Sequence, residues 1–212
     1  KVILIVTSDK CYDNLNDSEH FNEESILGGC DPYSSSKSCA ELVTNSYRNS
    51  YFKDRGVGIA TARAGNVIGG GDWASQRLIP DTLYSLENGM ELKLRYPSAV
   101  RPWQYVLEPL YGYLTLCEKL FTIQKEFDGP WNFGPGLGNH RSVKWIVDYL
   151  GQHHSGKNLV VNSQHAANKE KISIFLNSSK AQKLLNWKTV IPVSKALDNV
   201  LNWHETFQKN KN

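Results

Sequence analysis

A run of five strand-favouring residues, Val2 to Val6, opens the chain and leads directly into Thr7, Ser8, Asp9 and Lys10. An uninterrupted apolar run that ends in small polar residues is typical of a central parallel strand, buried on both faces. Such a strand needs a neighbour on each side, and only Lys1 precedes it in the printed sequence. Either both partners come from later segments, or the chain is a fragment of a larger sheet; we favour the fragment.

The remaining sequence alternates helical and strand patterns, as layered α/β proteins do. A helical pattern over 34–52 places Cys39, Val43, Tyr47 and Tyr51 on one face, which suits either a core or a dimer interface. Residues 65–73 are expected to form a loop, and Ser142 to cap a helix. Further strands are expected at 57–64, 91–95, 130–133, 158–161 and 172–176, and further helices at 80–87, 107–121, 143–150, 179–185 and 193–207.

Composition is that of an ordinary globular protein and disfavours several other classes. Hydrophobic residues make up 40% and charged residues 21%, and a net charge of +3 is too small to favour nucleic acid or an anionic membrane as partner. No apolar run approaches the ~20 residues of a membrane-spanning helix, and no signal-peptide pattern is present. The four cysteines lack Cys-x-x-Cys spacing, which favours reduced thiols in a cytosolic protein. The histidines show no metal-ligand pattern, and we expect His153 and His154 to face solvent.

Tyr33 and Lys37 are the first candidates for chemistry. Their separation of four residues at a helix start places both on one face, with Cβ atoms roughly 5–6 Å apart. A tyrosine acts as an acid or base near neutral pH only if its pKa falls by about 3 units from ~10, and a lysine ammonium about 4 Å away supplies an attraction of that order. With 10 tyrosines and 17 lysines in 212 residues, however, about 0.8 such pairs are expected by chance. The spacing alone therefore carries little weight.

The position of the pair gives it meaning. A polar loop over 13–29 joins the first strand to the helix of Tyr33. Ligands of open α/β sheets bind beyond the carboxyl ends of the strands, which places Ser8, Asp9 and Lys10 at the mouth of a crevice that the helix start can reach. A strand-end serine with a helical Tyr-x-x-x-Lys resembles the constellation of short-chain dehydrogenases/reductases, in which serine and tyrosine bind the substrate hydroxyl while hydride passes to NAD(P).

Longer blocks carry a more specific resemblance. They are Thr-Ser-Asp-Lys-Cys-Tyr-Asp-Asn (7–14), Asp-Pro-Tyr-Ser-Ser-Ser-Lys-Ser-Cys-Ala-Glu-Leu-Val (31–43), Ala-Arg-Ala-Gly-Asn-Val-Ile-Gly-Gly-Gly-Asp-Trp-Ala (62–74), Arg-Leu-Ile-Pro-Asp (77–81) and Arg-Pro-Trp-Gln-Tyr-Val-Leu-Glu-Pro-Leu (101–110). In this order and spacing they resemble the CDP-glucose 4,6-dehydratases, a family of extended short-chain dehydrogenases/reductases. The resemblance covers most of this chain but only the later part of a full-length family member.

The resemblance implies an α/β fold: part of a Rossmann-like parallel sheet plus a smaller mixed α/β substrate-binding region. Residues 1–68 would be the remaining half of an NAD-binding domain with the catalytic residues, and 69–212 mainly the substrate-binding domain, with about 104–133 returning to the sheet. No Gly-rich dinucleotide fingerprint occurs in the chain; in the family it lies upstream. The resemblance also implies NAD as cofactor, a CDP-hexose as substrate, a homodimer or homotetramer when full-length, and a cytoplasmic role in deoxysugar synthesis, such as that for lipopolysaccharide O-antigen.

The implied reaction converts CDP-glucose to CDP-4-keto-6-deoxyglucose and water: NAD takes hydride from C4, water leaves across C5 and C6, and hydride returns to C6. By resemblance, Tyr33 is the base at the C4 hydroxyl, with Lys37 activating it and holding the nicotinamide ribose, and Ser8 shares the hydrogen bond. Asp9 is the acid for the C6 hydroxyl, and Lys10 is similar to the lysine that CDP-sugar enzymes carry where dTDP-glucose dehydratases have a glutamate. An epimerase or reductase needs no acid there. Without the other blocks, a solvated pair of opposite charges would be the simpler interpretation.

Asn66, Arg77, Arg101 and Asn132 are the candidate substrate ligands by the same resemblance. Asn66 resembles the asparagine that faces sugar and pyrophosphate. The two arginines resemble basic residues that meet the diphosphate, which a guanidinium fork fits well. Asn132 ends a short strand and is either a nucleotide contact or a structural residue. No metal site is expected.

Three alternatives stay open. Residues 15–25 are polar where the family usually has aromatic residues, and Asn177 stands where aspartate is usual, so another nucleotide-sugar epimerase, reductase or dehydratase is one alternative. The missing fingerprint allows a second, a truncated inactive remnant that no longer binds NAD and serves as a binding or interaction module. A basic nucleic-acid-binding domain has little support, because no Lys/Arg stripe interleaves with aromatic residues.

Overall fold

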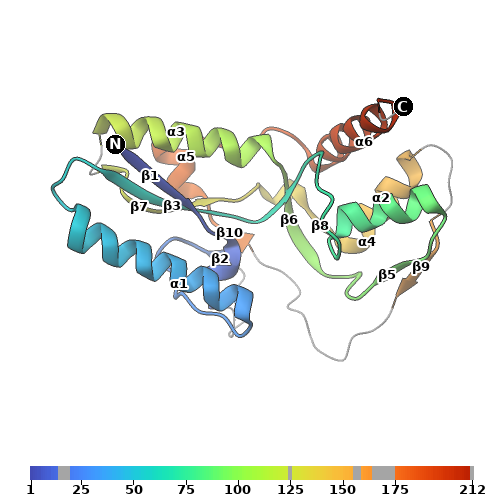
Figure 1. Cartoon of the computed structure of the whole chain (residues 1–212), viewed down its shortest axis with the longest axis horizontal. Helices are drawn as coiled ribbons and strands as arrows, with labels where there is room; N and C mark the ends of the chain where they lie inside the picture. Colours follow the sequence, from blue (N-terminus) through green and yellow to red (C-terminus); the bar gives the residue numbers. More distant parts are fainter. Residues whose placement is uncertain (14–19, 124–125, 155–158, 164–174, 211–212) are drawn as a thin grey trace. The chain divides into compact units, whose positions relative to one another are not determined.

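A computed structural model describes residues 1–13, 20–123, 126–154, 159–163 and 175–210 (Figure 1). Its contacts divide the chain into two units. The first unit combines Lys1–Gly65, Leu107–Gly136 and Ile174–Val190, and the second combines Asn66–Val106, Leu137–Ser173 and Ile191–Asn212. Residues 69–212 were predicted to be mainly the second region, with about 104–133 returning to the first; the structure adds Ile174–Val190 to the first unit.

A parallel three-stranded sheet, in the order β1–β3–β7, is the centre of the first unit. Its strands are β1 (Val2–Val6), β3 (Gly58–Ala64) and β7 (Gly129–Phe133), which confirms the three strands predicted here. Every residue of β3 is buried, because strands flank it on both sides and helices contact it. The predicted fold class, α/β with part of a Rossmann-like parallel sheet, is confirmed.

The prediction that β1 is buried on both faces is wrong for the described chain. β1 pairs with β3 along one edge, and within the described ranges no strand pairs with its other edge. Ile3 and Val6 are accordingly 39% and 53% exposed, although the run is as apolar as that of an inner strand. The apolar character is a local property, whereas burial requires a neighbouring strand.

Helices cover the two faces of this sheet (Figure 1). On one face α1 (Pro32–Tyr47) packs against β3, and on the other α3 (Leu107–Ile123) packs against β1 and β3. The short helix α5 (Ser179–Leu185) contacts α3 and β7. α1 continues into a π-helical turn, η2 (Arg48–Phe52), so the helix predicted over 34–52 is present in two parts.

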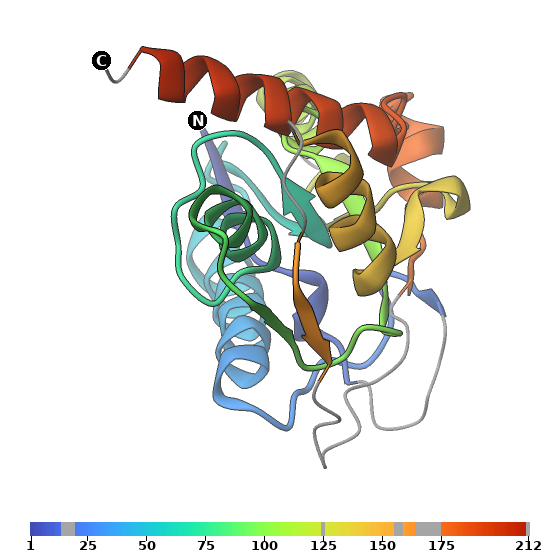
Figure 2. The same ribbon diagram turned by 90° about the vertical axis from the view of Figure 1, so that its right-hand side faces the viewer.

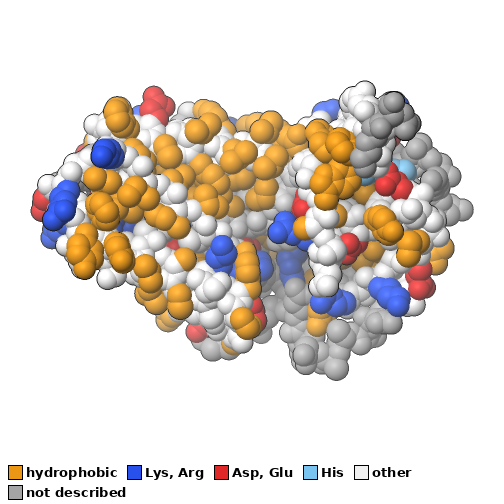
Figure 3. Space-filling model, in the orientation of Figure 1, with side chains coloured by type: hydrophobic (Ala, Val, Ile, Leu, Met, Phe, Trp, Pro, Cys, Tyr) orange, Lys and Arg blue, Asp and Glu red, His pale blue; other side chains and the backbone are white. Residues whose placement is uncertain are grey.

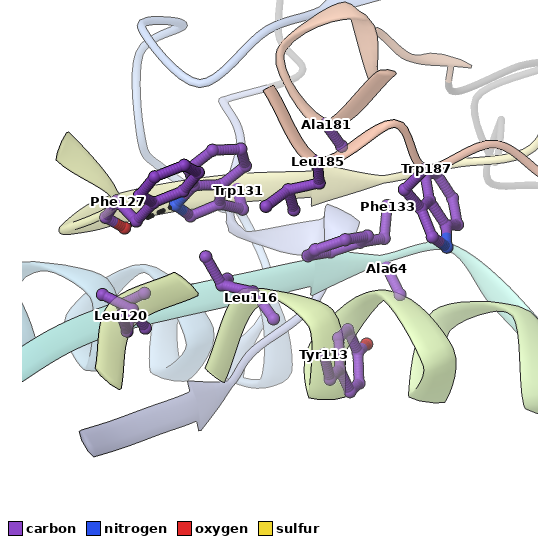
Figure 4. Packing of buried hydrophobic residues seen from close by; sticks show 12 residues of the cluster. Ala64, Tyr113, Leu116, Leu120, Phe127, Trp131, Phe133, Ala181, Leu185 and Trp187 are labelled. Atoms are coloured by element: carbon purple, nitrogen blue, oxygen red, sulfur yellow. Dashed lines mark hydrogen bonds between the residues drawn. The ribbon is translucent and has the colours of Figure 1, made fainter. Parts of the chain in front are cut away.

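The core of the first unit lies between the sheet and the helices α3 and α5 (Figure 4). β3 presents only small side chains to this core: Ala60, Ala62 and Ala64. Large aromatic residues of β7 fill the space, and Phe133 contacts Tyr113 and Trp187 edge-on at centroid distances of 5.2 and 5.0 Å. Such edge-to-face pairs add to the stabilisation from area burial alone.

α1 buries a polar face instead of its apolar one. Its buried side chains are Ser34, Ser38, Glu41 and Thr44. The predicted apolar stripe is exposed: Val43, Tyr47 and Tyr51 have exposed fractions of 54 to 58%, and Cys39 is also exposed. The helical periodicity was therefore correct, but this stripe does not belong to the core of the unit.

The second unit is built from short strands and longer helices. β6 (Val100–Tyr105) pairs in parallel with β4 (Asn66–Ile68) and antiparallel with β8 (His140–Ser142), while β5 (Leu92–Leu94) pairs with β9 (Val161–Ser163). α4 (Val143–His153) packs against α2 (Leu78–Asn88) and α6 (Val193–Lys209) (Figure 2). The helices and β5 were predicted. β4 lies in the predicted loop over 65–73, and β6 and β8 were not predicted because neither alternates regularly.

Smaller features test further predictions. Ser142 caps α4, with its Oγ accepting the Trp145 N–H at 3.1 Å, as predicted. The solvent-facing position predicted for His154 is wrong, since it is buried, whereas His153 is exposed.

In the first unit β2 (His20–Phe21) pairs with β10 (Phe175–Leu176). β10 lies within the strand predicted over 172–176, and the first three residues of that prediction lie outside the described ranges. All four cysteines are free. No helix in the described part of the chain is long and apolar enough to cross a membrane.

Gly112 provides a test of the core packing. A Cβ at this position would lie 2.5 Å from a ring carbon of Phe133 and 2.9 Å from Trp187 Nε1. We expect Gly112→Ala to lower the free energy of unfolding by about 1–3 kcal/mol, because the overpacking outweighs the gain in helix propensity. Gly136→Ala, where a Cβ meets nothing within 4 Å, is the matched control. Urea unfolding measures both, and equal stability of the two variants would contradict this account of the core.

Candidate active site

Ser8, Asp9 and Lys10 follow β1 at the carboxyl end of the sheet. Ser8 caps the short 3-10 helix η1 (Asp9–Cys11): its Oγ accepts the Lys10 N–H (3.2 Å) and donates to Asp9 Oδ1 (3.0 Å). Lys10 Nζ lies 3.0 Å from both carboxylate oxygens of Asp9. The side chains of Lys10 and Asp9 are 31% and 2% exposed, respectively. A solvated surface ion pair therefore does not describe them, because the acid is buried and only the ammonium reaches solvent.

α1 carries Tyr33 and Lys37 in its first two turns. Asp31 fixes the helix start by accepting the N–H groups of Tyr33 and Ser34 (both 3.0 Å) and the Ser34 hydroxyl (2.6 Å). These bonds, above all the one from the Ser34 hydroxyl, hold the pKa of Asp31 below its ordinary value. Lys37 Nζ lies 5.6 Å from the centre of the Tyr33 ring, and Tyr33 is 55% exposed. The two side chains share one face, with the phenol open to an incoming molecule.

η1 lies against α1. Ser38, directly after Lys37 and buried, shares its single hydroxyl proton between two carbonyl oxygens, Cys11 O at 2.7 Å and Gly28 O. These bonds tie the end of η1 and the end of the following loop to the same helical turn. The strand-end triplet and the Tyr33 helix, which the sequence analysis expected to meet, are thus neighbouring parts of one unit.

A buried polar network lies under α1, and the sequence analysis missed it. Glu41 Oε2 accepts Arg63 Nη2 and Thr61 Oγ1, both at 2.7 Å, and Glu41 Oε1 accepts the Thr7 hydroxyl. Both side chains of the ion pair are only 3% exposed. The sequence did hold a signal for this pair: an arginine inside a strand predicted to be buried on both faces requires a buried acid as partner.

The network extends to Asn132. Arg63 Nη1 donates to Tyr12 Oη (2.8 Å), whose hydroxyl donates to Asn132 Oδ1 (2.6 Å). Asn132 Nδ2 donates to Phe21 O at 3.0 Å, and the residue is fully buried. Of the two roles considered for Asn132, this geometry supports the structural one, because both ends of its amide are bonded within the protein.

The charges of the network depend on one another. Burial by itself would raise the pKa of Glu41, but the hydrogen bond and attraction from Arg63, with the threonine hydroxyls, hold it below its ordinary value. Burial would lower the pKa of Arg63, yet Glu41 raises it overall. Burial raises the pKa of the Tyr12 phenol above its ordinary value. The network therefore holds one carboxylate, one guanidinium and one neutral phenol around neutral pH.

A second group of candidates lines a cavity of about 290 Å³ in the second unit. Asn66 and Arg101, both predicted to bind substrate, are brought together there, and Arg101 is buried. Two further cations in its wall, Lys93 and Arg95, were missed. The sequence held a signal for these two cations, because charged and apolar residues alternate in the β5 segment: Lys93 and Arg95 are exposed on either side of the buried Leu94.

Arg77 does not line this cavity. Its side chain is 67% exposed and its Nη1 lies 3.3 Å from Asp72 Oδ2, a surface contact of small energetic value. In the parts of the chain that the structure describes, no cluster of three His, Cys, Asp or Glu side chains could hold a metal ion. The first unit presents a phenol, an ammonium and a buried acid, and the cavity of the second unit is lined by the cations Lys93, Arg95 and Arg101 and the carboxylate of Asp81.

Known sugar-nucleotide enzymes are similar to this chain in sequence. The model of the NAD dependent epimerase/dehydratase family matches residues 1–128. A CDP-glucose 4,6-dehydratase of Salmonella typhimurium is 43% identical, over 98% of this chain and 59% of its own length. The chain thus spans about three-fifths of that relative.

Solved structures share the fold at much lower identity. A dTDP-glucose 4,6-dehydratase from Bacillus anthracis in complex with NAD is 19% identical, with a TM-score of 0.75 over 97% of this chain and 62% of that one. A UDP-glucuronic acid 4-epimerase from Bacillus cereus, in complex with UDP-glucuronic acid and NAD, is 17% identical with a TM-score of 0.83, over 98% and 62%. At such identities the likeness shows the fold.

Replacing Glu41 by Gln tests the network. We expect the variant to lose about 3–5 kcal/mol of stability at neutral pH, because Arg63 is left buried without a counter-charge. The folded pKa of Glu41 is depressed, so its contribution is present above the unfolded value of ~4.3 and is lost as pH falls through the folded pKa. The difference between native and variant should therefore shrink in acid.

Urea unfolding from neutral pH down to about pH 3 measures this effect. Glu118→Gln, at an exposed position on α3, is the control and should change stability little at any pH. A Glu41→Gln deficit that stays constant across this range would show that the ionised carboxylate is not what stabilises the unit.

Proposed function

Because this chain belongs to the NAD dependent epimerase/dehydratase family, we propose that it is the proton-transfer and substrate-binding part of a sugar-nucleotide 4,6-dehydratase acting on CDP-glucose. The reaction would yield CDP-4-keto-6-deoxyglucose and water. The observation that carries the proposal is the buried acid Asp9, held by Ser8 and Lys10 beside the helix of Tyr33 and Lys37. A C4 oxidation needs only the tyrosine, whereas elimination of water also needs an acid.

Tyr33 is the proposed base for the C4 hydroxyl. Its exposed phenol can meet a substrate hydroxyl, and the Lys37 ammonium on the same face stabilises the phenolate that forms. Ser8 is proposed to share the bond to this hydroxyl, because its Oγ can act as both donor and acceptor at the strand end.

Asp9 is the proposed acid for the departing C6 hydroxyl. Its contact with Lys10 at 3.0 Å lets a proton pass between ammonium and carboxylate without backbone movement. Lys10 is the partly exposed member, so it connects the buried acid to solvent and can return the proton after each cycle. The 43% identity to a CDP-glucose 4,6-dehydratase supports this assignment over epimerisation.

NAD would supply the hydride step, accepting hydride from C4 and returning it at C6. This chain fits one end of such a cofactor, since Lys37 presents its ammonium beside an accessible Tyr33 where the nicotinamide ribose would be held. The glycine-rich phosphate loop that binds the dinucleotide elsewhere is not found in the sequence. We therefore assign this chain the nicotinamide end of the cofactor site alone.

The nucleotide diphosphate is assigned to the cavity of the second unit. Lys93, Arg95 and Arg101 bring three cations to its wall, and Asn66 adds an amide for hydroxyl or phosphate oxygens. Arginine forks match the geometry of phosphate oxygens. Arg77 was also predicted to bind the diphosphate, and this role stays a prediction.

Self-association and location complete the proposal. Large apolar side chains are exposed along two helices of the first unit, Leu42, Val43 and Tyr47 on α1 and Leu110, Leu114 and Phe121 on α3. Figure 3 shows hydrophobic side chains spread over the face on which these helices lie. Extended exposed apolar surface is typical of an interface, so we propose a homodimer formed through the Tyr33-bearing helix α1. The four free thiols favour a cytoplasmic location.

Asp9→Asn separates dehydration from the alternatives. With NAD and CDP-glucose, we expect the native chain to form a product lighter by one water, and the variant to form it at least ~100-fold more slowly, because the acid is lost. Partial C4 oxidation should persist, since Tyr33 is intact. Mass spectrometry and NMR follow both products, and Asp148→Asn on an exposed part of α4 is the control.

Unchanged product formation by Asp9→Asn would remove Asp9 from the acid role. An NAD titration of the native chain distinguishes the remnant alternative, because micromolar binding excludes an inactive binding module. Absence of both NAD binding and turnover would instead favour that alternative.

Arg95→Ala tests the nucleotide cavity. We expect the Kd of CDP to rise about tenfold or more, the effect of losing one hydrogen bond to a charged group. Lys144→Ala removes the same charge in the same unit but pairs with Asp148 outside the cavity, so it should leave the Kd unchanged. Calorimetric titration measures both, and equal affinities would place the diphosphate elsewhere.

A further inference from the structure

We infer that Thr7, Glu41, Arg63 and Tyr12 form a clamp that fixes both ends of η1 and so positions Asp9 relative to α1. None of the four is proposed to touch substrate, so they are positioning residues. The inference rests on the proposed function for the role of Asp9, but the clamp itself is a property of the folded first unit.

Glu41 holds the entry to η1. Its Oε1 accepts the hydroxyl of Thr7, the residue directly before Ser8, and its Oε2 accepts Arg63 Nη2 at 2.7 Å. The Thr7 N–H also donates to Ala62 O at 2.9 Å, so both main chain and side chain are fixed at this residue. Hydrogen bonds to a buried charge are stronger than those between neutral groups.

Arg63 holds the exit. Its Nη1 donates at 2.8 Å to the hydroxyl of Tyr12, the residue directly after η1, and its guanidinium lies 4.9 Å from the centre of the Tyr12 ring. Tyr12 is 2% exposed and donates in turn to Asn132 on β7. The same ion pair therefore contacts the chain immediately before and immediately after the segment that carries the proposed acid.

The clamp explains why a charged pair is buried at this place. Well-packed apolar side chains at these positions would often stabilise the fold as much as a buried ion pair does, so stability alone does not require the charges. Apolar side chains would not specify where a polar turn begins and ends, whereas directional bonds to Thr7 and Tyr12 do. A carboxylic acid within a short turn needs that definition, because loss of about 1 Å in position costs catalytic groups much of their rate.

Three isosteric variants test the clamp. Thr7→Val removes the hydroxyl that bonds Glu41 before η1, and Tyr12→Phe removes the hydroxyl that bonds Arg63 after η1. Thr61→Val is the matched control, because it removes the other hydroxyl that bonds Glu41 (2.7 Å), which comes from the middle of β3. Amide hydrogen exchange of Lys10 and Cys11, whose N–H groups bond Ser8 within η1, reports the position of the turn. We expect exchange at these amides to rise about tenfold in the first two variants, relative to Thr61→Val.

Thr7→Ser keeps the hydroxyl and should restore native exchange, which also guards against a Thr7→Val protein that does not fold. Equal exchange in all three isosteric variants, or no rescue by serine, would overturn the clamp. Exchange needs neither NAD nor substrate, so this result is independent of whether the proposed reaction occurs. In the turnover assay, Thr7→Val and Tyr12→Phe should lower kcat with KM unchanged, and an effect on KM alone would contradict positioning.

Discussion

The buried ion pair between Glu41 and Arg63 is the interaction on which the arrangement of the first unit depends. Removing two charges from water is costly, and attraction offsets that cost only when the remaining donors and acceptors are satisfied. Here the hydroxyls of Thr7 and Thr61 bond the carboxylate and the hydroxyl of Tyr12 bonds the guanidinium, while Arg63 Nε has no hydrogen-bond partner within the described residues. These partners lie just after β1, on β3 and just after η1, so their bonds to the charged groups fix the positions of these segments relative to Glu41 on α1.

β3 separates this polar layer from the hydrophobic core. Its alanines face α3 and the aromatic residues of β7, while Thr61 and Arg63 both donate hydrogen bonds to Glu41 on α1. β3 thus contributes to the hydrophobic core on one side and, on the other, to the polar network that contacts the segment of Asp9. This division also explains why α1 buries serine, threonine and glutamate and leaves its apolar stripe exposed.

The proposed acid and base are local to the first unit, and the proposed anion site is local to the second. Ser8, Asp9, Tyr33 and Lys37 come from two neighbouring elements, η1 with its cap and α1. The cations around Arg101 come from short strands that the chain forms after leaving the first unit. The chain covers about three-fifths of a related dehydratase, and the same fold appears at 14 to 20% identity in the related solved structures.

The sequence by itself determined the α/β class, the inner strands, most helices and the grouping of Ser8, Asp9 and Lys10 at a strand end, because periodicity, apolar runs and capping residues act over a few neighbouring positions. Only the tertiary structure decided which faces are buried. Burial of β1, the polar side of α1 and the pairing of Arg63 with Glu41 depend on partners 10 or more residues away. The bonds of Asn132, which support a structural role for this residue, reach 111 and 120 positions along the chain, beyond any local pattern.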